Sequence, residues 1–201
     1  REIRMSTRGM YAKYGPLLIA AAALIALPFA MRMLGLTIST AALVVILAIA
    51  TLGLNLLVGY TGLTSFGHGT WFGIGAYTAA LAQKHWLHDQ IVLPILLSMA
   101  FVAVLSTIVG ALILRRRGVY FSLLTLALAA LTYTIAFRWS EVTGGEDGLG
   151  GLKRGTLGPI DLDDGLAYYT FVAVIALGIL FGLLRVVRSP FGHVLMAIRE
   201  N

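Results

Sequence analysis

The sequence predicts an all-α fold, a polytopic bundle of about six transmembrane helices. Hydrophobic residues make up 59% of the 201 residues, charged residues make up 12%, and the mean hydropathy is +0.89. A water-soluble domain of this length does not need so many apolar residues to fill a core. The apolar residues also gather into separate runs, each close to the ~20 residues that a helix needs to cross a bilayer. We therefore expect residues 1–201 to form a single transmembrane domain.

The apolar runs cover residues 16–31, 36–58, 70–86, 91–114, 118–139 and 167–187. The first run follows a basic start and ends near small residues, so a secretory signal peptide is the alternative to a retained span. The chain begins at Arg1 instead of Met and ends at Asn201, just after a further helix begins. We therefore expect it to be a piece of a longer protein.

Lysine and arginine residues gather beside the apolar runs, so the net charge of +6 indicates membrane topology and not nucleic-acid binding. The three clusters are Arg1, Arg4, Arg8 and Lys13 before the first run, Arg115, Arg116 and Arg117 after the fourth, and Arg185 and Arg188 after the sixth. The positive-inside rule places all three clusters in the cytoplasm. Even numbers of runs separate the clusters, which agrees with about six spans and a cytoplasmic N-terminus.

Residues 140–165 form the one sizeable loop expected outside the membrane, and they are rich in glycine and acidic residues. Asp161, Asp163 and Asp164 match a calcium loop only in part, because its bidentate Glu and its spacing are missing, so a solvated loop is favoured. Lys153 follows Leu152 and is not part of a Gly-Lys-Ser/Thr phosphate loop. We expect no cofactor or metal here, and any ATP hydrolysis belongs to a separate subunit.

The most informative stretch is residues 59–77, which read Gly-Tyr-Thr-Gly-Leu-Thr-Ser-Phe-Gly-His-Gly-Thr-Trp-Phe-Gly-Ile-Gly-Ala-Tyr. Glycine permits irregular backbone and close backbone approach, and irregular backbone is tolerated at membrane depth only when it is buried or lines a watery path. We predict an irregular glycine-rich segment between spans two and three, with close approach at Gly67 and Gly73. The candidate path residues in this stretch are Thr64, Ser65, Gly67, His68, Gly73 and Tyr77.

Polar side chains within the spans supply further candidates. Asn55 lies one turn after Thr51, and such residues either face a cavity or form hydrogen bonds between helices. On the fifth span, small and hydroxyl-bearing residues recur at helical spacing, which makes one stripe. The stripe consists of Ser122, Thr125, Ala129, Thr132 and Ala136. The sequence leaves open whether Asn55 and this stripe face a path or a neighbouring helix.

Ser65 and His68 are three residues apart, which is the spacing to test for a nucleophile and its base. An intramembrane hydrolase is disfavoured because the spans contain no acidic residue to orient the base. A proton relay through His68 in an ion-coupled transporter is disfavoured for the same reason, since such relays use chains of acidic residues and histidine. We expect a structural role for His68 and no enzymatic activity in this chain.

The segment after the sixth run predicts a short amphipathic helix. Ser189 suits an N-cap and Pro190 suits the first helical position. Phe191, Val194, Leu195 and Ile198 then form one apolar stripe, followed by Arg199 and Glu200. From composition alone this helix either lies on the membrane surface or contacts a partner.

Several separated motifs resemble one known family. They are residues 59–69 with 72–77, residues 117–121 with 125–127, residues 143–149, and residues 189–192 with 197–201. In this order they are similar to the LivM-type permease of branched-chain amino acid ABC importers. The resemblance implies a bacterial inner-membrane permease that pairs with a LivH-type permease, two cytoplasmic ATPase subunits and an extracytoplasmic binding protein. It also implies that residues 189–201 lead into the cytoplasmic loop that docks on the ATPase.

The resemblance has two departures, at residues 62–68 and at Gly69, where family members often carry Gly-Gln-Leu-Ser-Leu-Gly-His and Ala. Both departures lie in the candidate path. A urea or short-amide permease of the same superfamily carries a similar Ser-x-Gly-His-Gly pattern and is the alternative for the substrate. An ion-coupled secondary transporter is the remaining alternative.

Overall fold

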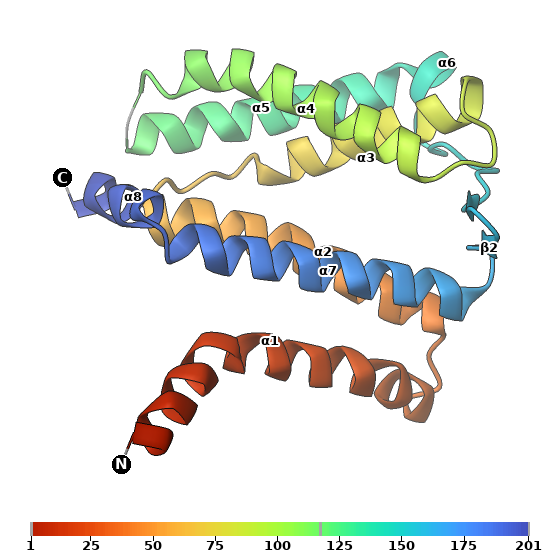
Figure 1. Cartoon of the computed structure of the whole chain (residues 1–201). Helices are drawn as coiled ribbons and strands as arrows, with labels where there is room; N and C mark the ends of the chain where they lie inside the picture. The colour runs from red at the N-terminus through yellow and green to blue at the C-terminus, as the bar shows by residue number, and fades with distance from the viewer. Residues whose placement is uncertain (1, 117, 201) are drawn as a thin grey trace. The chain divides into compact units, whose positions relative to one another are not determined.

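Long helices form at each of the apolar runs. The computed structural model describes residues 2–116 and 118–200, with side chains from Tyr14 onward, and the helices are labelled in Figure 1. The long helices are α1 (Glu2–Met33), α2 (Ile38–Asn55), α3 (His68–His85), α4 (Val92–Ile113), α5 (Val119–Arg138) and α7 (Gly165–Val187). Short elements are the π-helix η1 (Leu56–Tyr60), α6 (Ser140–Thr143), α8 (Pro190–Glu200) and strands β1 (Thr156–Leu157) and β2 (Ile160–Asp161). Arg1, Arg117 and Asn201, and the side chains of Arg4, Arg8 and Lys13, lie outside this description.

Five helices in the described part of the chain are long and apolar enough to cross a membrane. They are Tyr14–Met33, Ile38–Tyr60, Val92–Ile113, Val119–Arg138 and Gly165–Val187. Helix α3 forms where the third span is predicted and has 18 residues, but its last turn carries Gln83, Lys84 and His85. Helix α3 is not among the five helices that are long and apolar enough to cross a membrane, so composition supports five spans and does not show a sixth.

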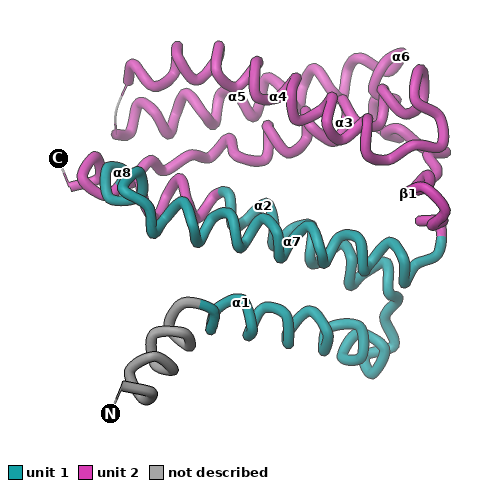
Figure 2. Tube along the Cα trace, viewed as in Figure 1, with its two compact units in different colours: residues 1–53, 164–195 teal, residues 54–163, 196–201 magenta. Residues whose placement is uncertain are grey.

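The chain divides into two compact units, which Figure 2 shows in different colours. Unit 1 contains residues 1–53 and 164–195, and unit 2 contains residues 54–163 and 196–201. We describe each unit by itself.

Unit 1 is built from α1, α2 and α7. Its core cluster joins Ala41, Ala42 and Val45 of α2 to the buried face of α7 around Tyr169. The small residues of α2 leave room for larger side chains of α7, such as Tyr169, to be buried in this cluster. The Tyr169 hydroxyl donates a hydrogen bond to the carbonyl of Leu24 in α1 at 2.5 Å. This hydrogen bond joins α1 to α7 within the unit.

Unit 2 contains α3, α4 and α5, which run across the view in Figure 1, each in the direction opposite to the helix before it. Helices α3 and α4 approach closely where the buried Ser98 hydroxyl donates to the Gly75 carbonyl at 2.7 Å. A Cβ placed on Gly75 would lie 3.4 Å from Ser98 Oγ, so a small residue suits this crossing. Glycine therefore serves helix packing at this position.

The loop before α7 is more ordered than the solvated loop that the sequence suggests. Strands β1 and β2 pair antiparallel, with Thr156 opposite Asp161. The carboxylate of Asp161 accepts the Asp163 N–H at 2.9 Å, and the Asp163 carboxylate accepts the Arg154 N–H at 3.1 Å. Asp164 caps α7 by accepting the Ala167 N–H at 3.1 Å. These aspartates order the turn and the helix start by binding backbone N–H groups.

Candidate translocation site

The irregular backbone occupies only part of the glycine-rich segment. The α-helix gives way to the π-helix η1 over Leu56–Tyr60, the backbone is non-helical over residues 62–67, and α3 begins at His68. Gly62 adopts a φ of +70°, a left-handed conformation that glycine accommodates most easily. The irregular backbone therefore lies between the second and third apolar runs, as predicted, and α3 begins two residues before the third run.

Helix α5 holds this segment through side-chain hydroxyls. Ser122 Oγ donates to the carbonyl of Thr64 at 2.7 Å, and the Phe66 N–H donates to Thr125 Oγ1 at 3.1 Å. Within the segment, the Gly67 N–H donates to Ser65 Oγ at 3.3 Å. The first half of the hydroxyl stripe therefore supplies the hydrogen bonds that an irregular backbone needs in lipid.

Gly67 and Gly73 differ in their surroundings, although the sequence predicts close approach at both. A Cβ on the buried Gly67 would lie 2.4 Å from the Thr125 carbonyl oxygen, so this backbone contact requires glycine. A Cβ on Gly73 would have no atom within 4 Å. The expectation for Gly73 is therefore wrong: its missing side chain opens space in a cavity instead of permitting a backbone contact.

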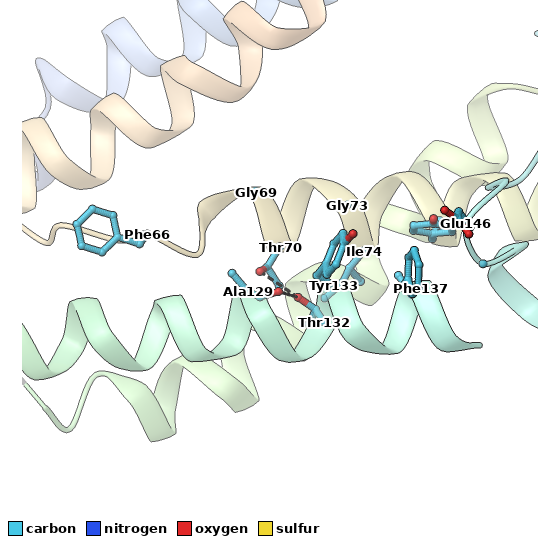
Figure 3. A pocket seen from close by; sticks show the side chains of 13 residues that line it. Phe66, Gly69, Thr70, Gly73, Ile74, Ala129, Thr132, Tyr133, Phe137 and Glu146 are labelled. Carbon is cyan, nitrogen blue, oxygen red and sulfur yellow. Dashed lines mark hydrogen bonds between the residues drawn. The ribbon is translucent and has the colours of Figure 1, made fainter. Parts of the chain in front are cut away.

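That cavity lies between α3 and α5 in unit 2 and has a volume of about 610 Å³ (Figure 3). Its lining residues are Phe66, Gly69, Thr70, Gly73, Ile74, Tyr77, Ala129, Thr132, Tyr133, Ala136, Phe137, Gly145 and Glu146. Of the predicted path residues, Gly73 and Tyr77 line it, together with the second half of the hydroxyl stripe. The others lie outside the lining: Asn55, Thr64, Ser65, Gly67, His68, Ser122 and Thr125.

The cavity combines three kinds of surface. Thr70 Oγ1 and Thr132 Oγ1 are 3.2 Å apart and share a hydrogen bond between α3 and α5. Tyr133 and Phe137 stack with their ring centroids 5.9 Å apart. Glu146 alone carries a charge among the described residues that line the cavity. This set is an apolar pocket with a few convergent polar groups, which is the usual character of a small-molecule site.

Sequence reasoning missed Glu146 and the two aromatic residues. Glu146 lies in the glycine-rich loop, where acidic residues are ordinary, and Tyr133 and Phe137 look like lipid-facing residues of an apolar span. The position of Glu146 within the 143–149 motif was the available signal.

A constrained turn presents Glu146 to the cavity. The buried Thr143 hydroxyl donates to the Trp139 carbonyl at 2.8 Å and accepts the Gly145 N–H at 3.2 Å. Gly144 and Gly145 have φ values of +79° and +61°, which L side chains rarely adopt. A Cβ on Gly144 would also meet the Gly148 carbonyl oxygen at 2.1 Å. The turn therefore depends on glycine for its geometry.

Asn55 and His68 lie next to the irregular segment rather than in the cavity. The Asn55 side chain is exposed, and its Oδ1 would lie 2.9 Å from a Cβ on Gly59 in the π-helix η1. Such π-helical turns occur often at functional sites. His68 is half-buried at the start of α3. The alternatives for both side chains stay open.

The C-terminal helix α8 forms over the stretch expected from sequence, beginning at Pro190. Ser189 does not cap it with its side chain as predicted, because the hydroxyl donates to the Val186 carbonyl at the end of α7, at 2.6 Å. The Ser189 carbonyl accepts the Gly192 N–H in the first turn of α8, at 3.0 Å. Phe191 is exposed and Leu195 is half-buried, while Glu200 is exposed at the last position of the helix.

Arg199 connects the end of α8 to the start of the glycine-rich segment within unit 2. Its Nη1 donates to the carbonyl of Gly59 at 2.7 Å. Its Cγ would lie 3.0 Å from a Cβ on Gly62, so the arginine stem rests against the glycine backbone. The contact therefore joins two segments that are far apart in sequence.

The sequence of this chain is similar to that of known membrane transport permeases. Residues 36–201 match the family described as branched-chain amino acid transport system / permease component. The chain is 31% identical to the high-affinity branched-chain amino acid transport system permease protein LivM of Escherichia coli strain K12, and 28% identical to the protein of that name in Salmonella typhimurium strain LT2. Each alignment covers 82% of this chain and 44% of the relative, so the chain spans about half the length of these relatives.

No solved structure gives a significant match to the chain. The family match nevertheless covers most of the chain and includes every residue that lines the cavity. With its membrane-spanning helices, the chain is a multi-pass membrane protein, and it belongs to the family of branched-chain amino acid transport permease components.

Proposed function

We propose that this chain is a permease subunit of an ATP-driven importer that carries branched-chain amino acids across a bacterial inner membrane. The observation that carries the proposal is the family match through residues 36–201, which includes the whole cavity between α3 and α5. The cavity offers apolar surface for a branched side chain and polar groups for the charged end of an amino acid. The resemblance adds a LivH-type permease, two ATPase subunits and an extracytoplasmic binding protein as partners.

The proposed topology has six crossings, with α3 as the third. The contact between Arg199 and Gly59 supports it, because both residues must lie at the same face of the membrane. Helices α3, α4, α5 and α7 separate the two residues along the chain. Without a crossing by α3, three spans would separate them and put them on opposite faces. At 1.5 Å per residue, the 18 residues of α3 extend about 27 Å, close to the ~30 Å hydrocarbon thickness.

The opposite end of unit 2 supports the same topology. The Thr156 N–H donates to the Asp89 carbonyl at 2.9 Å, which joins the α3–α4 connection to the loop before α7. Two spans, α4 and α5, separate these loops, so both lie at one face. We assign that face to the outside, with the basic residues after α4 and α7 in the cytoplasm.

We assign ATPase coupling to α8, at the cytoplasmic end of the bundle. Phe191 and Ile198 expose 60% and 59% of their surface in this chain, which leaves an apolar stripe available to a partner. Arg199 at the end of the same helix binds the π-helix that precedes the glycine-rich segment. A displacement of α8 by a bound ATPase would therefore pull directly on that segment, which is how a nucleotide-driven change would reach the path.

Uptake by the complete transporter, with the full-length permease in proteoliposomes, tests the function. We expect labelled leucine to enter only with the binding protein and ATP, and to continue entering when an uncoupler removes the proton gradient. Excess unlabelled leucine should compete, whereas excess urea should not. Uptake that persists without the ATPase and stops with the uncoupler would identify an ion-coupled carrier and contradict the proposal.

A pair of variants tests the coupling assignment. Phe191→Asp with Leu195→Asp places two charges on the apolar stripe, so we expect less ATPase to co-purify while membrane insertion is unchanged. His193→Asp adds a charge elsewhere on the same exposed helix and serves as the control. Full recovery of the ATPase and normal uptake with the double variant would show that α8 rests on lipid and does not couple.

A further inference from the structure

We propose that Glu146 binds the α-ammonium group of the substrate and thereby selects amino acids from uncharged amides. The inference rests on the proposed function, because it names the group that recognises the substrate in the same cavity. It concerns a residue in the turn after α6 and not in a transmembrane helix.

The charge of the cavity lining points to a cation. Glu146 is the one charged group among the described lining residues, and the rest of the lining is apolar, aromatic or hydroxyl-bearing. Glu146 is exposed, so its charge is partly screened by water, and it still attracts a cationic group that enters the cavity. A ligand with a positive group at this end and an aliphatic group along Ile74 and Ala129 complements the cavity.

The stacked rings of Tyr133 and Phe137 favour the same class of ligand. Both rings line the cavity together with Glu146, as Figure 3 shows. An ammonium group within about 6 Å of an aromatic face is attracted by the electron density of the ring. Carboxylate and aromatic faces together therefore attract an ammonium group, which carries a full positive charge, more strongly than the neutral N–H groups of urea.

The turn fixes the backbone from which the Glu146 side chain extends. Thr143 is buried and bonded on both sides of the turn, and Gly144 and Gly145 hold backbone conformations that other residues rarely adopt. The backbone that carries Glu146 is therefore ordered before the ligand arrives, so binding loses less backbone conformational entropy. Asp147, the next residue, does not line the cavity.

Glu146→Gln and Asp147→Asn form a matched pair, because each removes one negative charge from the same turn. We expect Glu146→Gln to raise the KM for leucine uptake by the complete transporter about fivefold, the size of a partly exposed ion pair with an aromatic contribution. Asp147→Asn should leave the KM unchanged, and Glu146→Asp should recover part of the affinity. The amount of assembled complex for each variant, measured by size-exclusion chromatography, separates recognition from folding.

Ligand binding to the purified permease complex, without ATPase turnover, gives a second readout. We expect millimolar leucine and 3-methylbutylamine, which keeps the ammonium group, to raise the melting temperature of the wild type and of Asp147→Asn. Neither should stabilise Glu146→Gln. The acid without the amine, 4-methylpentanoate, should stabilise none of them.

The outcomes separate the two proposals. If the wild-type transporter takes up no leucine with ATP, the proposed function and this inference both fail. If it takes up leucine but Glu146→Gln has the KM of Asp147→Asn, only the assignment of Glu146 is wrong. Equal stabilisation of the wild type by the amine and the acid would overturn the assignment without any substitution.

Discussion

Replacing Gly67 with alanine should destabilise the protein more than any other single methyl group added to the glycine-rich segment. Gly67 has a φ of −103°, which alanine can adopt, so the effect comes from the contact and not from backbone strain. The new Cβ would lie 2.4 Å from the Thr125 carbonyl oxygen and 3.0 Å from the carbonyl carbon. Both are backbone atoms inside α5, which cannot rotate away as a side chain can.

The size of the effect follows from what must move. The segment and α5 have to separate by roughly 0.6 Å, a change typical of an overpacked core that costs about 1–3 kcal/mol. That separation lengthens the Phe66 N to Thr125 Oγ1 hydrogen bond, now 3.1 Å, beyond its useful range. The lost bond contributes about 1 kcal/mol. We therefore expect Gly67→Ala to lower the free energy of unfolding by about 2–4 kcal/mol.

Gly69→Ala is the matched control, because a Cβ on Gly69 meets no atom within 4 Å and the residue lies in the first turn of α3. Alanine is favoured over glycine in a helix by up to about 1 kcal/mol, so this variant should be neutral or more stable. Unfolding of the full-length permease by SDS in mixed micelles, followed by circular dichroism, measures both. A difference below about 1 kcal/mol between the two variants would refute the contact as the reason for glycine at this position.

Three further predictions concern other parts of the chain. Cysteine at Asp163 should react with an impermeant reagent from outside, and cysteine at Arg116 from the cytoplasm; the reverse pattern would invert the topology. Tyr169→Phe should lower the free energy of unfolding by about 1 kcal/mol through loss of the bond to Leu24, and an unchanged value would mean that this bond does not hold α1. Gly144→Ala should lower the free energy of unfolding by about 2 kcal/mol or more, because the new side chain combines a φ of +79° with a clash against a backbone carbonyl. An unchanged free energy of unfolding would mean that the turn relaxes freely.

The helices were predictable from sequence because their signal is long and repeated. Apolar runs of roughly 20 residues have few alternatives to a helix in lipid, where every backbone group must find a partner. The predicted run at 36–58 corresponds to the observed Ile38–Tyr60 and differs by two residues at each end. The prediction was weakest for α3, where glycine at the start and polar residues at the end dilute the apolar signal.

The position of the glycine-rich segment was predicted from sequence, but the separate roles of its glycines were not. Glycine marks both close packing and irregular backbone, and its two uses read alike in sequence. Gly67 meets the backbone of α5, whereas Gly73 in the regular helix α3 faces a cavity. Only the partner across the contact distinguishes the two, and that partner lies more than fifty residues away along the chain.

Only part of the cavity lining could be predicted from sequence. Thr132 and Ala136 follow a helical stripe, so their shared face could be read from spacing. Glu146 has no such period, because it reaches the cavity through a turn whose path is set by the backbone of Gly144 and Gly145 and by the hydroxyl of Thr143. A charge in a solvated loop and a charge at the edge of a substrate cavity have the same local sequence. What separates them is the path of the turn after α6, and in this chain that path brings Glu146 to the cavity that Tyr133 and Phe137 also line.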